Sequence, residues 1–324
     1  MTSVAPQIRS THQARPRFEG SNIGSWIGFK HVMYLVEEAV LEHLRQRGLP
    51  PRELYERHGL GTEIVDSDTR ILTALHLDDA VRTEVSEVAD DSGRGELVLR
   101  AESFVDPPDG GPVKAASATV RVVWRAEPDS AGGEPGPPVP ALAAAHTVPR
   151  IDRAGGPGPA VDLAGRGTTG DPPAALTGGN RFSWRWRVPY FYCHFSDRLQ
   201  HSGYLRLMEE VVDLFLADRG LSIATMLERH RWIPVVPRAR VELLREAKLE
   251  EELFTVFTVE EVFKNLTYTG RMDCYVHRAG QLVPTATGRI THGYATVVDR
   301  RDWRLVEFDQ PTVAALRGEP GPAS

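Results

Sequence analysis

The chain repeats itself at one fixed spacing, and this repeat constrains its fold more than any other feature. Short similar strings recur 172 residues apart (for example 209 − 37 = 172) without a gap. The matching strings are Glu37-Glu38 with Glu209-Glu210, Gly48 with Gly220, Glu56-Arg57-His58 with Glu228-Arg229-His230, and Leu77-Asp78-Asp79 with Leu249-Glu250-Glu251. Such a spacing predicts two copies of one structural unit that arose by gene duplication.

The second copy contains an amphipathic helix that begins near Tyr204. Its apolar residues recur three or four positions apart, which is the spacing of one helical face: Leu205, Met208, Val212 and Phe215. Gly220 predicts the C-terminal end of this helix. Asp197 and His201 come just ahead of it, at the positive end of the helix dipole. These two titratable residues are therefore the strongest candidates for chemistry.

Each copy combines a long helix with a run of strands. In the first copy, we predict a long helix that ends at Gly48, a short helix over residues 51–58, and strands over residues 70–77, 82–88, 96–104 and 115–124. In the second copy, strands are predicted over residues 182–188, 241–249, 253–263, 267–278, 285–299 and 303–308. A long helix followed by an antiparallel run of strands indicates an α+β fold.

Composition divides the chain into five parts. Residues 127–179 are dense in Gly, Pro and Ala and contain almost no aromatic residues. Such a segment cannot bury enough apolar surface to offset its ordering entropy, so we predict a disordered linker. The parts are then a flexible tail (1–17), a first domain (18–126), the linker (127–179), a second domain (180–310) and a second tail (311–324).

The overall composition excludes several classes of protein. The net charge of −6 argues against general nucleic-acid binding. No apolar run approaches the roughly 20 residues that span a bilayer, and the N-terminus lacks the apolar core of a signal peptide. Two cysteines, Cys193 and Cys274, allow at most one disulfide and no zinc site. We expect a cytoplasmic protein that binds neither nucleic acid nor membrane.

The start of the long helix in the second copy resembles a known family. The string HSGYLRLMEE, with Asp197 upstream, is similar to the hot-dog-fold acyl-CoA thioesterases of the 4-hydroxybenzoyl-CoA type. Six residues match the family's helix string, namely Tyr204, Leu205, Arg206, Met208, Glu209 and Glu210, while Leu207 stands at its aromatic position. The loop after Asp197 is shorter than in that family. The resemblance implies two hot-dog domains in tandem, each a long helix wrapped by an antiparallel sheet.

The resemblance also implies a reaction, the hydrolysis of an acyl-CoA or acyl-carrier-protein thioester. Asp197 is then the general base or the nucleophile. His201 orients water or assists proton transfer, and the amides of Gly203 and Tyr204 form the oxyanion site. Glu209 is a second candidate acid, two turns into the helix. No metal or redox cofactor is implied, because CoA or phosphopantetheine belongs to the substrate.

The first copy lacks these groups. At the fixed spacing, Ser25 replaces Asp197, Phe29 replaces His201, and Val32 replaces Tyr204. We therefore expect a single active site in the second copy, with the first copy providing a wall of the cleft. Pairing of the two domains within one chain leaves open whether the protein forms a homo-oligomer.

Two other functions compete with hydrolysis. The four-residue spacing of Asp197 and His201 resembles that of double-hot-dog dehydratases, which act on 3-hydroxyacyl thioesters. Those enzymes also need a His in the first copy, and its loop, SNIGSWIGF, contains none. The third possibility is a non-catalytic protein that binds an acyl chain or a carrier protein, because a fold match alone does not establish chemistry.

Overall fold

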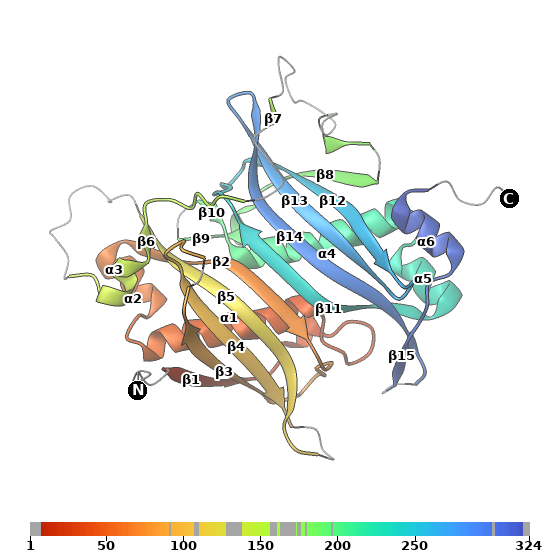
Figure 1. Ribbon diagram of the computed structural model, residues 1–324, viewed down its shortest axis with the longest axis horizontal. Coiled ribbons are helices and arrows are strands. Elements are labelled where there is room, and N and C mark those ends of the chain that lie inside the picture. Colours follow the sequence, from red (N-terminus) through yellow and green to blue (C-terminus); the bar gives the residue numbers. More distant parts are fainter. Residues whose placement is uncertain are drawn as a thin grey trace. The chain divides into compact units, whose positions relative to one another are not determined.

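The computed structural model divides into two compact units, Met1–Ile151 (unit 1) and Asp152–Ser324 (unit 2). The structure describes residues 8–90, 92–106, 110–127, 138–155, 161–162, 173, 176–178, 180–195, 197–299 and 302–319. Each unit is a long helix lying against one face of an antiparallel sheet, as Figure 1 shows. This is the predicted α+β architecture.

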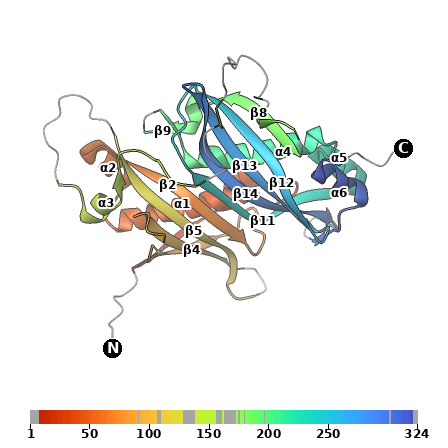
Figure 2. The same ribbon diagram turned by 45° about the horizontal axis from the view of Figure 1, so that its top comes forward.

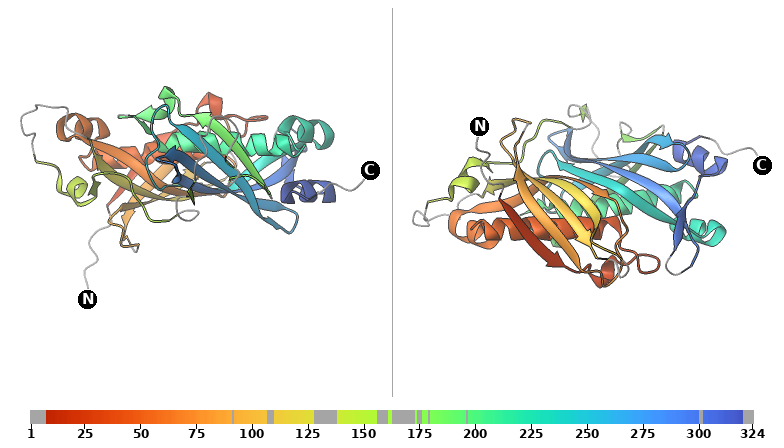
Figure 3. Two further views of the ribbon diagram at one scale, coloured as in Figure 1. Left: turned by 90° about the horizontal axis from the view of Figure 1, so that it is seen from above. Right: turned by 60° about the horizontal axis from the view of Figure 1, so that its bottom comes forward.

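Unit 1 is organised around helix α1 (Phe29–Gln46), followed by the short helix α2 (Pro51–His58). Its strands are β1 (Arg9–Ala14), β2 (Leu60–Ile71), β3 (Val81–Val88), β4 (Leu97–Val105) and β5 (Val113–Ala126), in the order β1–β3–β4–β5–β2. Helix α1 lies against one face of this sheet, as Figure 3 shows. Its apolar face packs there in a buried core that includes Val36, Val40, Leu99 and Trp124. Burial of that face is the main force that holds the helix in place.

Unit 2 repeats this plan around helix α4 (His201–Asp218), followed by α5 (Ile223–His230). Its main strands are β8 (Arg181–Arg187), β11 (Trp232–Leu243), β12 (Glu252–Phe263), β13 (Thr267–Arg278) and β14 (Gln281–Val297), in the order β8–β12–β13–β14–β11. The short strands β7 (Val161–Asp162) and β15 (Trp303–Leu305) pair with β14, and β9 (Cys193–His194) pairs with β10 (Arg198–Leu199). Helix α6 (Gln310–Arg317) lies beside α5 at one end of this sheet in both Figure 1 and Figure 2.

The bounds of the elements confirm the repeat. Adding 172 to the limits of α1, α2 and β2 gives the limits of α4, α5 and β11 at both ends. The backbone agrees as well, since Asp78 and Glu250 both have positive φ angles, 73° and 69°. The same spacing relates β1 to β8, and the short 3-10 turn Phe18–Gly20 to the turn Tyr190–Tyr192.

The structure differs from the sequence prediction at the ends of the units. Residues 1–17 were expected to be a flexible tail, but β1 pairs there with β3 as an edge strand. The C-terminal tail contains α6, which Asp309 caps by accepting a hydrogen bond from the Thr312 amide. Residues 138–155 of the expected linker contain α3 (Ala141–Ala145) and β6 (Thr147–Val148), which pairs in parallel with β5. Much of the remaining linker lies outside the described residues.

The first strand of each unit is also shifted from its predicted position. Strands were expected over residues 70–77 and 241–249, whereas β2 and β11 end at Ile71 and Leu243. In β2, the polar residues Glu63, Asp66 and Ser67 are buried rather than exposed, so the strand does not show the simple alternation of a half-buried strand. Among the described residues, none of the helices has the length and hydropathy of a membrane span.

Gly270 lets two layers of unit 2 approach closely. A Cβ at this position would overlap the ring of Phe257 on the neighbouring strand, which is buried and packs on Phe215 of α4 with ring centroids 5.1 Å apart. We predict that Gly270→Ala destabilises the protein by about 1–3 kcal/mol, the usual cost of overpacking a core. Urea unfolding measures this loss, and Gly111→Ala is the control because a Cβ there meets no atom within 4 Å. Equal stability of the two variants would contradict this packing.

Candidate active site

Helix α4 begins at His201, three residues before the predicted start. The amides of Gly203 and Tyr204 therefore lie inside its first turn, where both donate to the carbonyl of Gln200, at 3.0 and 3.4 Å. An amide engaged in this way does not stabilise an oxyanion. The structure thus gives no support to the predicted oxyanion role of these two amides, while the N-terminal end of α4 keeps its partial positive charge.

Asp197 lies in the loop that leads into α4. Its Oδ2 atom is 3.1 Å from Nζ of Lys248, and the side chains are 48% and 45% exposed. The carbonyl of Asp197 also accepts a hydrogen bond of 2.6 Å from the Leu249 amide. The loop is therefore fixed to the turn after β11, with the carboxylate paired to a cation but open to water. A carboxylate in this setting can act on water or on an electrophile.

His201 and Glu209 occupy different parts of α4. His201 is the first helical residue and is 4% exposed, so it is buried at the same end of the helix as Asp197. Glu209 is half-buried and lies eight residues further on, a rise of about 12 Å along the helix axis. Within unit 2, the structure thus places Asp197 and His201 at one end of the helix and leaves Glu209 apart from them.

Gly203 and Tyr204 serve the packing of α4. A Cβ on Gly203 would lie 2.6 Å from Leu199 Cδ1 and 3.3 Å from Tyr192 Cβ, so only glycine allows this approach. Tyr204 is fully buried, and burial, together with the nearby Cys274, raises the pKa of its hydroxyl well above the usual range. Tyr204 therefore stays neutral and contributes to the core.

An aromatic group covers the flank of α4 next to this end. The rings of Trp184 and Trp186 stack with centroids 5.8 Å apart, and the Tyr192 ring meets Trp186 edge-on at 5.8 Å. The Arg206 guanidinium of α4 lies 5.4 Å from the centre of the Tyr192 ring, close enough for a cation–π interaction. These contacts hold the turn Tyr190–Tyr192 against the helix.

Lys248 is the site residue that sequence reasoning missed, and we expect it to orient Asp197. Half-exposed ion pairs contribute about 1 kcal/mol or less. Lys248→Met should therefore lower kcat/KM for any reaction that depends on Asp197 by no more than about fivefold, while Lys248→Arg should keep most of the activity. Steady-state kinetics of the two variants tests this role. A larger loss that arginine does not restore would place Lys248 in direct contact with the substrate instead.

The contact between the short turn and the long helix is made by a glycine and a bulky residue in both units, but the two residues are interchanged in unit 1. Gly20 corresponds to Tyr192, and His31 corresponds to Gly203, at the spacing of 172. A Cβ on Gly20 would lie 2.7 Å from Cγ of His31. The bulky residue therefore stands on the turn in unit 2 and on the helix in unit 1. This reciprocal exchange keeps both helices packed against the turn that precedes them.

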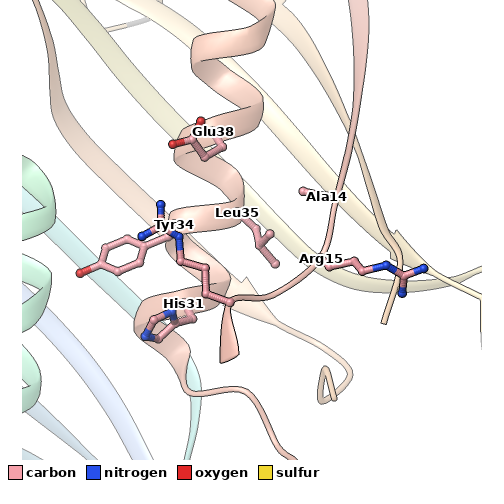
Figure 4. Close-up of a pocket in the computed structure, with 7 residues that line it drawn as sticks. Ala14, Arg15, His31, Tyr34, Leu35 and Glu38 are labelled. Carbon is pink, nitrogen blue, oxygen red and sulfur yellow. The ribbon is translucent and has the colours of Figure 1, made fainter. Parts of the chain in front are cut away.

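A small pocket lies in unit 1 between β1 and α1 (Figure 4). Ala14 lines it from the strand, where unit 2 has Trp186 at the same spacing. The helix contributes His31, Tyr34, Leu35 and Glu38. The volume of the pocket is about 80 Å³. Figure 4 shows that Arg15 points away from His31 and Tyr34. A tryptophan in one unit is thus replaced by a small, partly polar space in the other.

Unit 2 also contains a buried polar cluster away from the N-terminal end of α4. The rings of Tyr268 and His292 stack with centroids 5.3 Å apart, and Tyr294 lies close to Tyr268. Neither ring nitrogen of His292 has a hydrogen-bond partner among the described residues, and burial lowers the pKa of His292 to about 3. His292 is therefore neutral at physiological pH.

In the described part of the chain, no three His, Cys, Asp or Glu residues gather where they could hold a metal ion.

Residues 185–316 match the family described as the thioesterase-like superfamily, a range that includes Asp197 and all of α4. No curated protein matches the chain significantly.

Three solved structures that are similar to most of the chain have the same fold. The 12:0-ACP thioesterase from Umbellularia californica has a TM-score of 0.56 at 13% identity, covering 88% of this chain and 94% of that chain. An acyl-ACP thioesterase from Bacteroides thetaiotaomicron has a TM-score of 0.51 at 11% identity, covering 88% and 97%. A Lactobacillus plantarum protein described as an oleoyl thioesterase has a TM-score of 0.55 at 14% identity, covering 91% and 99%. The protein thus has a tandem hot-dog fold, in which residues 185–316 match the thioesterase-like superfamily.

Proposed function

We propose that the protein hydrolyses an acyl thioester, with the active site at the N-terminal end of α4 in unit 2. The observation that carries this proposal is the overlap of sequence family and geometry. The residues that match the thioesterase-like superfamily include Asp197 and His201, which the fold places at one end of the helix. Similar structures of nearly the same length, named as acyl-ACP thioesterases, support the choice of an acyl thioester.

In the proposed mechanism, Asp197 acts on the thioester carbonyl carbon. Acting as a general base, its carboxylate takes a proton from water while the water oxygen bonds to that carbon. Acting as a nucleophile, it forms an acyl anhydride that water then cleaves. In either case the C–S bond breaks and the thiolate leaves. The positive end of α4 stabilises the negative charge that develops on the carbonyl oxygen.

Other groups of the site have supporting roles in this proposal. His201 transfers a proton toward the departing thiolate, while Lys248 holds the Asp197 carboxylate in place. Glu209 is proposed as a second acid that faces a more distant part of the substrate. The reaction draws on side chains and water, and the CoA or phosphopantetheine group enters with the substrate.

Thiol release from a panel of acyl thioesters tests this function. The panel contains short, long and aromatic acyl-CoAs and the same acyl groups on a purified acyl carrier protein. We expect release from at least one acyl group, and the ratio of kcat/KM on the two carriers identifies the natural one. A parent protein that releases no thiol, but that converts a 3-hydroxyacyl thioester to the enoyl product, would overturn hydrolysis in favour of dehydration. Binding without turnover would indicate an acyl-binding protein.

A further inference from the structure

Unit 1 retains the site framework of unit 2 but carries different chemistry on it. Ser25 corresponds to Asp197, and His76 corresponds to Lys248, at the spacing of 172. The Leu77 amide donates to the Ser25 carbonyl at 2.8 Å, just as the Leu249 amide donates to the Asp197 carbonyl at 2.6 Å. The loop ahead of the helix is therefore fixed to the same turn in both units.

The turn itself is also built alike. The His76 amide donates to Oδ2 of Asp79 at 2.7 Å, and the Lys248 amide donates to Oε2 of Glu251 at 2.7 Å. The side-chain contact across this framework is an ion pair in unit 2. In unit 1 it is a hydrogen bond of 3.2 Å between Oγ of Ser25 and Nδ1 of His76. A carboxylate–ammonium pair has thus been replaced by a hydroxyl–imidazole pair.

A hydroxyl next to an imidazole is the pairing that nucleophilic catalysis uses, because the imidazole accepts the proton as the oxygen attacks. Ser25 and His76 are both half-buried, so the pair is partly shielded from water while it remains accessible. Ser25 follows Gly24, whose φ angle of +85° forms the tight turn. Trp26, next in the chain, lies with its ring centroid 6.1 Å from that of His76. The pair is therefore held by backbone and packing on both sides.

We propose that Ser25 and His76 form a second, nucleophilic site in unit 1 that accepts an acyl group. Oγ of Ser25 bonds to the carbonyl carbon of an acyl thioester while its proton passes to Nδ1 of His76. The C–S bond then breaks, and the thiolate takes that proton and leaves as the thiol. An acyl ester on Ser25 remains, which water cleaves with His76 again accepting and returning the proton. No oxidant, reductant or metal ion is required.

The carbonyl oxygen would lie near the N-terminal end of α1, whose partial positive charge stabilises it as the bond forms. The choice of an acyl thioester as donor rests on the proposed function of unit 2. The reactivity of Ser25 does not, and it is tested separately with a reagent that needs no thioester.

The test uses a fluorophosphonate, which phosphonylates serines activated by a base, followed by peptide mass mapping of the full-length protein. We expect one adduct on Ser25 and none in Ser25→Ala. Ser21→Ala is the matched control, because Ser21 is in the same loop but its hydroxyl donates to the Phe18 carbonyl. His76→Gln can still hydrogen-bond to Ser25 but does not take a proton. It should slow labelling by about 10²-fold or more, the size of a general-base contribution.

The outcomes separate this site from the one in unit 2. Asp197→Asn should be labelled on Ser25 at the parent rate, even if thioester hydrolysis is lost or was never present. Circular dichroism checks that each variant is folded, and added imidazole should partly restore labelling of His76→Ala. Labelling at another residue, no labelling, or equal rates for parent and folded His76→Gln would overturn the proposal.

Discussion

Asp197→Asn is expected to lower kcat/KM for thiol release by about 10²–10⁴-fold, which is the usual contribution of a general base. Asparagine has nearly the same shape and can still accept a hydrogen bond from Lys248, which is 3.1 Å from Oδ2 in the parent. It cannot take a proton from water or attack a carbonyl. The loss should therefore appear in kcat, with KM little changed, because the substrate contacts remain.

A matched control shows that this loss belongs to the site. Asp213 is an exposed carboxylate on α4, and Asp213→Asn removes the same charge from the same helix. We expect it to keep activity within about twofold of the parent, because exposed charges have small effects. Full activity in Asp197→Asn would exclude this carboxylate and direct attention to Glu209.

The second large effect concerns stability in acid. The pKa of His292 is lowered by burial to about 3, whereas an unfolded histidine has a pKa near 6.5. Below pH 6.5 the unfolded chain takes up a proton that the folded chain does not, so stability falls as the pH falls. The loss approaches about 1.4 kcal/mol per pH unit, or up to about 2.7 kcal/mol at pH 4.5. Above pH 6.5 this contribution is constant.

His292→Phe isolates this effect, since it fills a similar volume without a titrating group. The free energy of unfolding of parent and variant is measured with urea between pH 4 and 8. The difference between the two proteins should be constant above pH 6.5 and should increasingly favour the variant below it. Tyr268, which stacks on His292, and the nearby Tyr294 do not titrate in this range, because burial raises both pKa values. His277→Gln, on the half-buried His277 of β13, is the control. A difference independent of pH would show that His292 is not buried as described.

The repeat made most of the fold predictable from sequence. It identified the long helices and the order of elements, because similar residues at one spacing impose the same packing twice. The start of α4 was missed because Ser202 and Gly203 are poor helix formers. Gly203 is helical because Leu199 and Tyr192 pack closely on it, which is a tertiary contact. Strand β1 was missed for a similar reason, because its polar sequence becomes a strand only by pairing with β3.

The candidate site was predictable only in part. Asp197 and His201 could be proposed from sequence because they are near each other and precede a recognisable helix, and their catalytic role stays a prediction. Lys248 is 51 residues from Asp197, and no local pattern connects them. The Ser25–His76 pair contains none of the family's residues, so the family resemblance does not point to it. The spacing of 172 relates Ser25 to Asp197 and His76 to Lys248, but the pair stands out only once Lys248 is seen to contact Asp197.

The most direct test of the central claim is to locate the thioester on the protein. A crystal structure of Asp197→Asn with an intact acyl-CoA, or with the acyl carrier protein of the preferred acyl group, would show its carbonyl carbon. We predict that this carbon lies within about 3.5 Å of residue 197, with its oxygen toward the N-terminal end of α4. A thioester bound far from α4, or held only by unit 1, would contradict the assignment of hydrolysis to unit 2.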